Sequence, residues 1–360
     1  MPSVWAQVEP LLQSIERPTR YIDSEWGAVR KPDAAYRVAL LYPDTYEIGM
    51  ANQGLAILYA ALNAIDDVAA ERTYLPWSDM SELMRAHDVP LFTLETCTPI
   101  SECDLLGITL PYELTYSNIL EALDMSGLAL RSADRGQADP IVFGGGPCVY
   151  NPEPIAPFFD AILIGEGEEA VLEIVAAHRK AKADGLDRQA IVRALADVPG
   201  VYVPSLYDAP AGPAGYTIAK PISDDVPMPV VKRVVADLDA HRTPVCPVVP
   251  FMDVVHDRAG IEVLRGCSRG CRFCQAGMVY RPVRERSADT IVRDSVAALA
   301  CTGYDEISLT SLSTTDHSQL SEVLRRLKRR LEGTGTSVSL PSLRVDAFGV
   351  EAARLVAGAG

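Results

Sequence analysis

Three cysteines stand within eight residues of the sequence, at Cys267, Cys271 and Cys274. Thiolates bind soft metals, and three of them on one loop can hold a metal centre that keeps one position open. The stretch from Arg265 to Arg286 also holds six arginines and one glutamate, in a chain with a net charge of −15. This basic segment is either a solvated loop or a site for an anionic cluster, cofactor or substrate. The overall negative charge argues against a protein that coats nucleic acid.

Zinc and an iron–sulfur cluster are the two candidate metal centres. A structural zinc site takes four ligands, usually as two separated cysteine pairs. Only three cysteines cluster here, and the nearest others are Cys246 and Cys301. Cys301 ends an amphipathic helical pattern, where we expect a small buried core residue. The missing fourth ligand therefore favours an iron–sulfur cluster with one open iron.

Two series of strand and helix patterns should position these residues. In the first series, short apolar runs alternate with helical patterns and no hairpin turns intervene. The segments are 36–43, 49–65, 71–76, 78–87, 104–111, 116–127, 140–146, 160–167 and 168–184. This alternation predicts an α/β fold with a mostly parallel sheet, whose ligands bind at the carboxyl ends of the strands.

The second series follows a proline-rich stretch, with strand patterns at 261–266, 305–312 and 337–345 and helical patterns at 287–300, 316–332 and 350–360. The cysteine loop comes after its first strand. The middle helix should bury one face and begin with a capping box of Asp316 and Gln319, and Gly333 should end it. The expected buried residues are Leu320, Val323, Leu324, Leu327 and Leu331. Three such units cannot close a barrel, so we expect a fragment of a longer protein or an unusually short version.

The 360 residues suffice for about two domains, each with its own core. Apolar residues make up 48% of the chain, but no apolar run approaches the roughly 18 residues of a membrane span. The N-terminus lacks the basic head and apolar stretch of a signal peptide. We therefore predict a cytoplasmic protein with no membrane partner. The eight cysteines are unevenly spread, and in a reducing compartment clustered thiols indicate metal binding or catalysis before disulfides.

The segment "CSRGCRFC" resembles the cysteine signature of the radical S-adenosylmethionine (radical SAM) enzymes, including the aromatic Phe273 before the third cysteine. This resemblance implies that Cys267, Cys271 and Cys274 bind three irons of a 4Fe-4S cluster and that S-adenosylmethionine chelates the fourth. Reductive cleavage of S-adenosylmethionine would then give a deoxyadenosyl radical that abstracts hydrogen from a substrate. A reductant protein such as a flavodoxin or ferredoxin is the implied partner.

The stretch "SLTSLST" ends the second strand of this series, where the family receives the amino group of S-adenosylmethionine, often with Gly-Gly-Glu. This chain has Ser311, Leu312 and Ser313 there, so backbone carbonyls and hydroxyls would have to bind the cofactor. The alternative is an ordinary helix entry rich in serine and threonine. Arg344 is a further candidate, for the carboxylate of the cofactor.

The first series resembles the cobalamin-binding domain that precedes many radical enzymes. Its signature is Asp-x-His-x-x-Gly, and "DTYEIG" keeps Asp44 and Gly49 but has Tyr46 in place of the histidine. A phenol with a pKa near ~10 is a poor cobalt ligand at neutral pH. Cobalamin would then bind without a lower protein ligand, or the site is vestigial. Three successive glycines end the strand pattern at 140–146, namely Gly144, Gly145 and Gly146. They either allow close approach of the backbone to a nucleotide tail or form a plain turn.

The resemblance divides the chain into an N-terminal lead (1–35), a Rossmann-type, doubly wound cobalamin-binding-like domain (36–199), a connector (200–260) and the first half of a radical SAM partial (β/α) barrel (261–360). The leading hypothesis is a radical SAM enzyme that uses cobalamin to transfer a methyl or alkyl group, or to assist another rearrangement, on an unknown RNA, peptide or small molecule. In one alternative the first domain is a vestigial scaffold that recognises substrate. In the other the protein is an iron–sulfur redox sensor or interaction module.

Overall fold

The computed structural model describes residues 3–344 except 211, 213, 214, 216, 217 and 242. The chain forms two compact units. The first comprises Met1–Ser24 and Ala28–Val234, and the second comprises Glu25–Gly27 and Val235–Gly360. No helix in the described ranges is long and apolar enough to cross a membrane.

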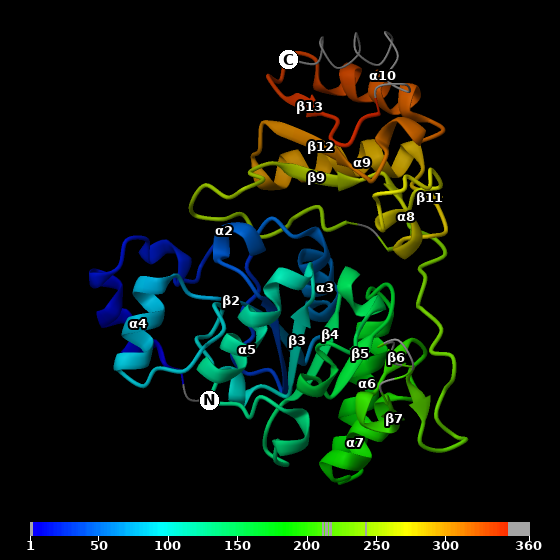
Figure 1. Cartoon of the computed structure of the whole chain (residues 1–360). Coiled ribbons are helices and arrows are strands. Elements are labelled where there is room, and N and C mark those ends of the chain that lie inside the picture. Colours follow the sequence, from blue (N-terminus) through cyan, green and yellow to red (C-terminus); the bar gives the residue numbers. More distant parts are fainter. Residues whose placement is uncertain (1–2, 211, 213–214, 216–217, 242, 345–360) are drawn as a thin grey trace. The chain divides into compact units, whose positions relative to one another are not determined.

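The first unit is built on a six-stranded sheet in the order β2-β1-β3-β4-β5-β6 (Figure 1). Neighbouring strands are parallel except β6, which runs antiparallel to β5. The predicted parallel α/β sheet is therefore confirmed. The strands are β1 (Tyr36–Tyr42), β2 (Val68–Tyr74), β3 (Leu105–Thr109), β4 (Ile141–Gly145), β5 (Ala161–Leu163) and β6 (Val201–Tyr202).

Helices cover both faces of this sheet. Ala39 and Leu41 of β1 share one core with buried residues of α4 and α5. α3 contacts β1, β2 and α6 and contributes no buried residue to that core, so it covers the opposite face. The helices of the unit are α1 (Trp5–Val8), α2 (Tyr46–Gly49), α3 (Gln53–Asn63), α4 (Ser78–Ala86), α5 (Tyr116–Met125), α6 (Ala170–Ala183) and α7 (Arg188–Leu195). Two short strands, β7 (Tyr207–Asp208) and β8 (Lys220–Pro221), pair antiparallel outside the main sheet.

The second unit contains three parallel strands in the order β13-β12-β9 (Figure 1). These are β9 (Ala259–Glu262), β12 (Glu306–Thr310) and β13 (Ser337–Ser339). Two helices pack on this sheet, α9 (Ala288–Thr302) and α10 (Leu320–Leu331). Within the described residues the sheet stays open, as expected for the first strands of a partial barrel. The helix predicted at 350–360 lies outside the described residues.

The sequence pattern of α10 is confirmed in its body and wrong at its start. All five predicted face residues are buried, and Gly333 adopts the positive φ (+76°) that suits glycine after a helix. The N-cap is Gln319, but its side chain caps nothing and instead accepts a hydrogen bond from the backbone N–H of Ala288. Asp316 forms no capping box because its carboxylate binds side chains from elsewhere.

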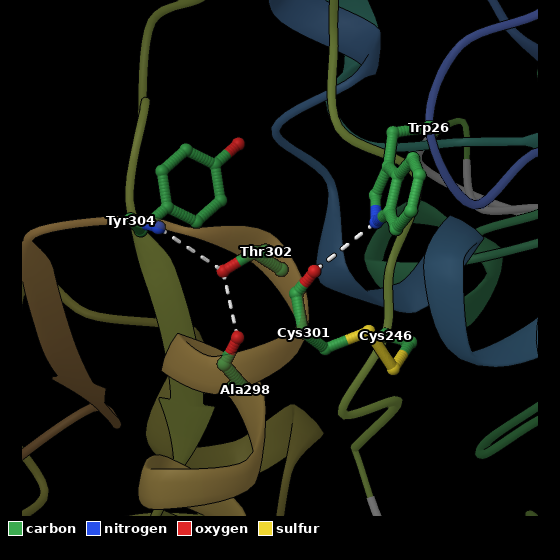
Figure 2. Close-up of a disulfide and its surroundings, with 6 residues drawn as sticks. All are labelled: Trp26, Cys246, Ala298, Cys301, Thr302 and Tyr304. Atoms are coloured by element: carbon green, nitrogen blue, oxygen red, sulfur yellow. Dashed lines mark hydrogen bonds between the residues drawn. A yellow bond between two sulfur atoms is a disulfide. The ribbon is translucent and has the colours of Figure 1, made fainter.

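Cys246 and Cys301 form a disulfide, with sulfur atoms 1.98 Å apart and Cα atoms 5.5 Å apart (Figure 2). Cys301 is also only partly buried, so the prediction of a small buried core residue is wrong. The indole nitrogen of Trp26 donates to the carbonyl oxygen of Cys301 at 3.1 Å, and Trp26 also pairs with Val249. The end of α9 thus meets two segments distant in sequence, which no local pattern could indicate.

Candidate functional site

The cysteine loop is closed at its base by a small antiparallel pair. β10 (Leu264–Arg265) pairs with β11 (Arg284–Glu285), which splits the single strand predicted at 261–266 into β9 and β10. Gly266 follows β10 with φ +88°, and a Cβ there would lie 2.5 Å from the carbonyl oxygen of Tyr280. Only glycine therefore fits where the loop leaves β10.

A half-buried acid connects both ends of this loop. Glu262, the last residue of β9, accepts two hydrogen bonds from Arg265 at 2.8 and 2.9 Å and one from Arg286 at 3.0 Å. Burial alone would raise the pKa of Glu262, but the two guanidinium groups outweigh it and hold that pKa below its ordinary value. Arg286 also donates to the carbonyl oxygens of Leu238 and His241. Two arginines of the basic segment therefore bind groups within the second unit.

All three loop cysteines have free thiols. Cys267 is half-buried, whereas Cys271 and Cys274 are exposed. Phe273 between them is 92% exposed, so this apolar ring also has no packing role in the second unit. Across the described ranges, no group of three or more His, Cys, Asp or Glu side chains is arranged to hold a metal ion. The fit of the three cysteines to an iron–sulfur cluster therefore rests on their donor type, their accessibility and their place on one loop.

The residues after β12 form a hydrogen-bonded turn. Ser311 shares a hydrogen bond with Thr314 at 2.8 Å and accepts one from the backbone N–H of Ser313. Ser313 is 1% exposed and donates its hydroxyl to Asp316 at 2.8 Å, while Leu312 is exposed. Both hydroxyls considered for S-adenosylmethionine thus have partners within the turn. A role of this turn in binding the cofactor stays a prediction.

Asp316 connects this turn to the cysteine loop. Its carboxylate receives two hydrogen bonds from Arg269, which lies between Cys267 and Cys271; the Nε contact is 2.8 Å. Arg344 approaches the same carboxylate at 3.5 Å. The pKa of Asp316 is lowered to about 2. The hydrogen bonds from Arg269 are the largest cause, burial opposes them, and the hydrogen bond from Ser313 adds to the lowering.

The sequence reasoning missed this role of Asp316. The only signal was an acidic residue soon after a strand, which also suited a helix cap.

In the first unit, the strand order changes direction between β1 and β3. Ligands of such sheets bind where the order reverses, at the carboxyl ends of the strands. Asp44 follows β1 and Tyr112 follows β3, and the Tyr112 hydroxyl donates to Asp44 at 3.0 Å. Four exposed apolar side chains follow the ends of β1, β2 and β3, namely Ile48, Trp77, Tyr112 and Leu114. This edge therefore offers apolar surface where a ligand is expected.

Two of the cobalamin-motif positions serve packing. Tyr46 is 1% exposed, and its ring packs edge-on against Tyr74 with ring centroids 5.5 Å apart. A Cβ at Gly49 would lie 2.3 Å from the same Tyr74 ring, so glycine makes room for it. Tyr46 thus packs in the core beside α2, and a role of this residue in binding cobalamin stays a prediction.

The glycine run after β4 is divided between packing and open space. A Cβ at Gly144 would lie 2.7 Å from Leu110 and 2.9 Å from Phe159. Gly146 has φ +127°, and its Cβ would lie 2.7 Å from the carbonyl oxygen of Leu110. Gly145 alone has no atom within 4 Å of that position. It is the glycine that leaves room for a ligand to approach the backbone.

Comparison with known proteins gives matches to both units. Residues 54–204 match the family of N-terminal regions of radical SAM proteins, and residues 261–360 match the radical SAM superfamily. The uncharacterised protein MJ0966 of Methanocaldococcus jannaschii is 24% identical over 330 residues, which cover 89% of this chain and 58% of that protein. The chain therefore spans a little over half the length of this curated relative.

Solved structures share the fold at low identity. The radical S-adenosylmethionine methyltransferase TsrM from Kitasatospora setae, with cobalamin and a 4Fe-4S cluster bound, has a TM-score of 0.54 and 17% identity, over 90% of this chain and 57% of that chain. The cobalamin-dependent radical enzyme OxsB, with aqua-cobalamin and S-adenosylmethionine bound, has a TM-score of 0.50 and 14% identity, over 89% and 41% respectively. Residues 54–204 and 261–360 therefore each resemble a radical SAM family, and the fold of the chain is that of the solved cobalamin-dependent radical SAM enzymes.

Proposed function

We propose that this protein is a radical SAM enzyme that cleaves S-adenosylmethionine reductively and starts radical chemistry on a substrate. One observation carries the proposal. Three free thiols lie on one loop after β9, inside the segment that matches the radical SAM superfamily. Cys271 and Cys274 are exposed, so no packing role explains them.

The residues around the loop have defined tasks in this proposal. Cys267, Cys271 and Cys274 would hold a 4Fe-4S cluster, which supplies the electron that cleaves the cofactor when both are bound. Glu262 keeps the two ends of the loop together through Arg265 and Arg286. Electrons must enter from a reductant protein, for which a flavodoxin or a ferredoxin is suited.

We further propose cobalamin as a second cofactor, bound at the carboxyl edge of the first sheet and used to transfer a methyl or alkyl group. Three features of that edge support it: the strand-order reversal, the exposed apolar side chains and the open position at Gly145. Because Tyr46 is buried, cobalamin would bind without a lower ligand from this position. The cobalamin held by TsrM, which shares this fold, is consistent with the assignment.

The test is anaerobic purification followed by analysis of iron, sulfide, zinc and cobalt. We expect about four irons per chain, lost when the three loop cysteines are changed to alanine. Cys148→Ala is the matched control, because this free thiol lies outside the loop and should leave the iron unchanged. Zinc in place of iron would overturn the proposal.

Two further outcomes separate the alternatives. Iron without cobalt, even after reconstitution with cobalamin, would make the first unit a scaffold that recognises substrate. A reduced cluster that never cleaves S-adenosylmethionine would instead indicate an iron–sulfur sensor.

A further inference from the structure

A side-chain ion pair attaches the cysteine loop to the segment after β12, and the proposed cofactor chemistry does not explain it. Arg269 lies inside the loop, and Asp316 lies six residues beyond β12. The two side chains form a two-point ion pair across 47 residues of sequence. A guanidinium with two of its three nitrogens on one carboxylate fixes orientation as well as distance.

The carboxylate is itself held in place. The Ser313 hydroxyl donates to Asp316 at 2.8 Å, and the backbone N–H of Ser313 donates to Ser311. The Arg269 side chain is 45% exposed whereas that of Asp316 is only 18% exposed, so the acid is the more firmly held partner and the exposed loop supplies the cation. An ion pair with one ordered partner loses less conformational entropy than one between two free side chains.

We propose that Asp316 is a positioning residue that holds the cysteine loop on the carboxyl end of β12 through Arg269. This inference rests on the proposed function, since it assigns a place to the loop that would carry the cluster. Asp316 sets the separation between the three cysteines and the turn at 311–314, where we expect the amino group of S-adenosylmethionine. A cluster on the three cysteines and a cofactor at this turn would thereby be held at a fixed separation, without a contact from Asp316 to either.

The first experiment measures alkylation of Cys267, the half-buried thiol of the loop, in the iron-free protein, so it does not depend on the proposed cluster. Asp316→Asn removes the charge, and we expect alkylation to become roughly three- to tenfold faster, a modest factor because the pair is partly exposed. Glu306→Gln is the matched control. It breaks the 3.0 Å ion pair with Arg258 at the opposite end of β12, and should leave alkylation unchanged.

The second experiment uses the reconstituted protein and the electron paramagnetic resonance spectrum of the reduced cluster. We expect Asp316→Asn to bind iron but to need roughly tenfold more S-adenosylmethionine for the cofactor-induced change in that spectrum. The exchanged pair Arg269→Asp with Asp316→Arg should restore both readouts toward wild type.

The outcomes separate this inference from the proposed function. Unchanged alkylation in Asp316→Asn overturns the positioning role, whatever the metal content. Faster alkylation with an unchanged cofactor response also overturns it, because Asp316 would then only brace the loop. A wild-type protein that binds no iron overturns the proposed function, while alkylation still decides whether Asp316 holds the loop.

Discussion

The carboxyl ends of the two sheets differ in what their motif residues do. In the first unit, Tyr46, Gly49 and Gly144 lie in tight packing, and each is accounted for by its neighbours. In the second unit, Cys271 and Phe273 are exposed and contribute nothing to the core. A motif residue without a structural task requires a chemical explanation, whereas a packed one does not. The evidence for chemistry is therefore stronger at the second edge than at the first.

The largest expected effect is the loss of stability of the second unit when its disulfide is removed. Cys246 and Cys301 close a loop of 55 residues that includes the whole cysteine loop. Chain-entropy arguments assign roughly 4 kcal/mol to such a loop. We expect Cys301→Ser to lower the free energy of unfolding of the second unit by that order without reductant, and to have no effect with excess dithiothreitol. Denaturant unfolding with and without reductant measures this, and a deficit that persists in dithiothreitol would show a packing role instead.

Acid should weaken the first unit by a comparable amount. His178 of α6 is buried against Tyr36, and burial lowers its pKa to about 4. Between pH 6.5 and 4 the unfolded chain takes up a proton that the folded histidine does not, so stability falls as pH falls, by up to about 3 kcal/mol in all. The Arg269 and Asp316 pair stays charged over that range, because the pKa of Asp316 is about 2. Thermal unfolding of the first unit across this range should be flatter in His178→Gln, and equal slopes would contradict the assignment.

Two adjacent glycines test the first edge directly. Gly144→Ala should destabilise the first unit by about 1 to 3 kcal/mol, because its methyl group would meet Leu110 and Phe159. Gly145→Ala adds a methyl group into open space, and should change stability by less than about 0.5 kcal/mol. If cobalamin binds at this edge, Gly145→Ala should instead raise its dissociation constant. Unfolding curves and cobalamin titration of the two variants separate packing from binding.

The smallest effect should come from Tyr46. Because its ring is buried against Tyr74, Tyr46→Phe should leave the absorption spectrum of bound cobalamin unchanged. A shifted spectrum would mean that the phenol reaches cobalt. A motif residue of the first edge would then have a chemical role, as the cysteines of the second edge are proposed to have.

The sequence by itself determined what short-range patterns encode. The parallel strands and the buried face of α10 were predictable, because the spacing of apolar residues reflects contacts within a single strand or helix. The family match could likewise be expected from eight residues around Cys271.

Tertiary structure decided the contacts between distant segments. The disulfide of Cys301 and the ion pair of Asp316 join residues 55 and 47 positions apart, so neither leaves a local signature. Asp316 has the same residue type and spacing as a helix cap, and only the nearby Arg269 redirects its carboxylate. Likewise the three glycines after β4 look equivalent in sequence, but the neighbours around each one assign Gly144 to packing and leave Gly145 open. Packing is a property of the assembled fold, and therefore the roles of these residues emerge only there.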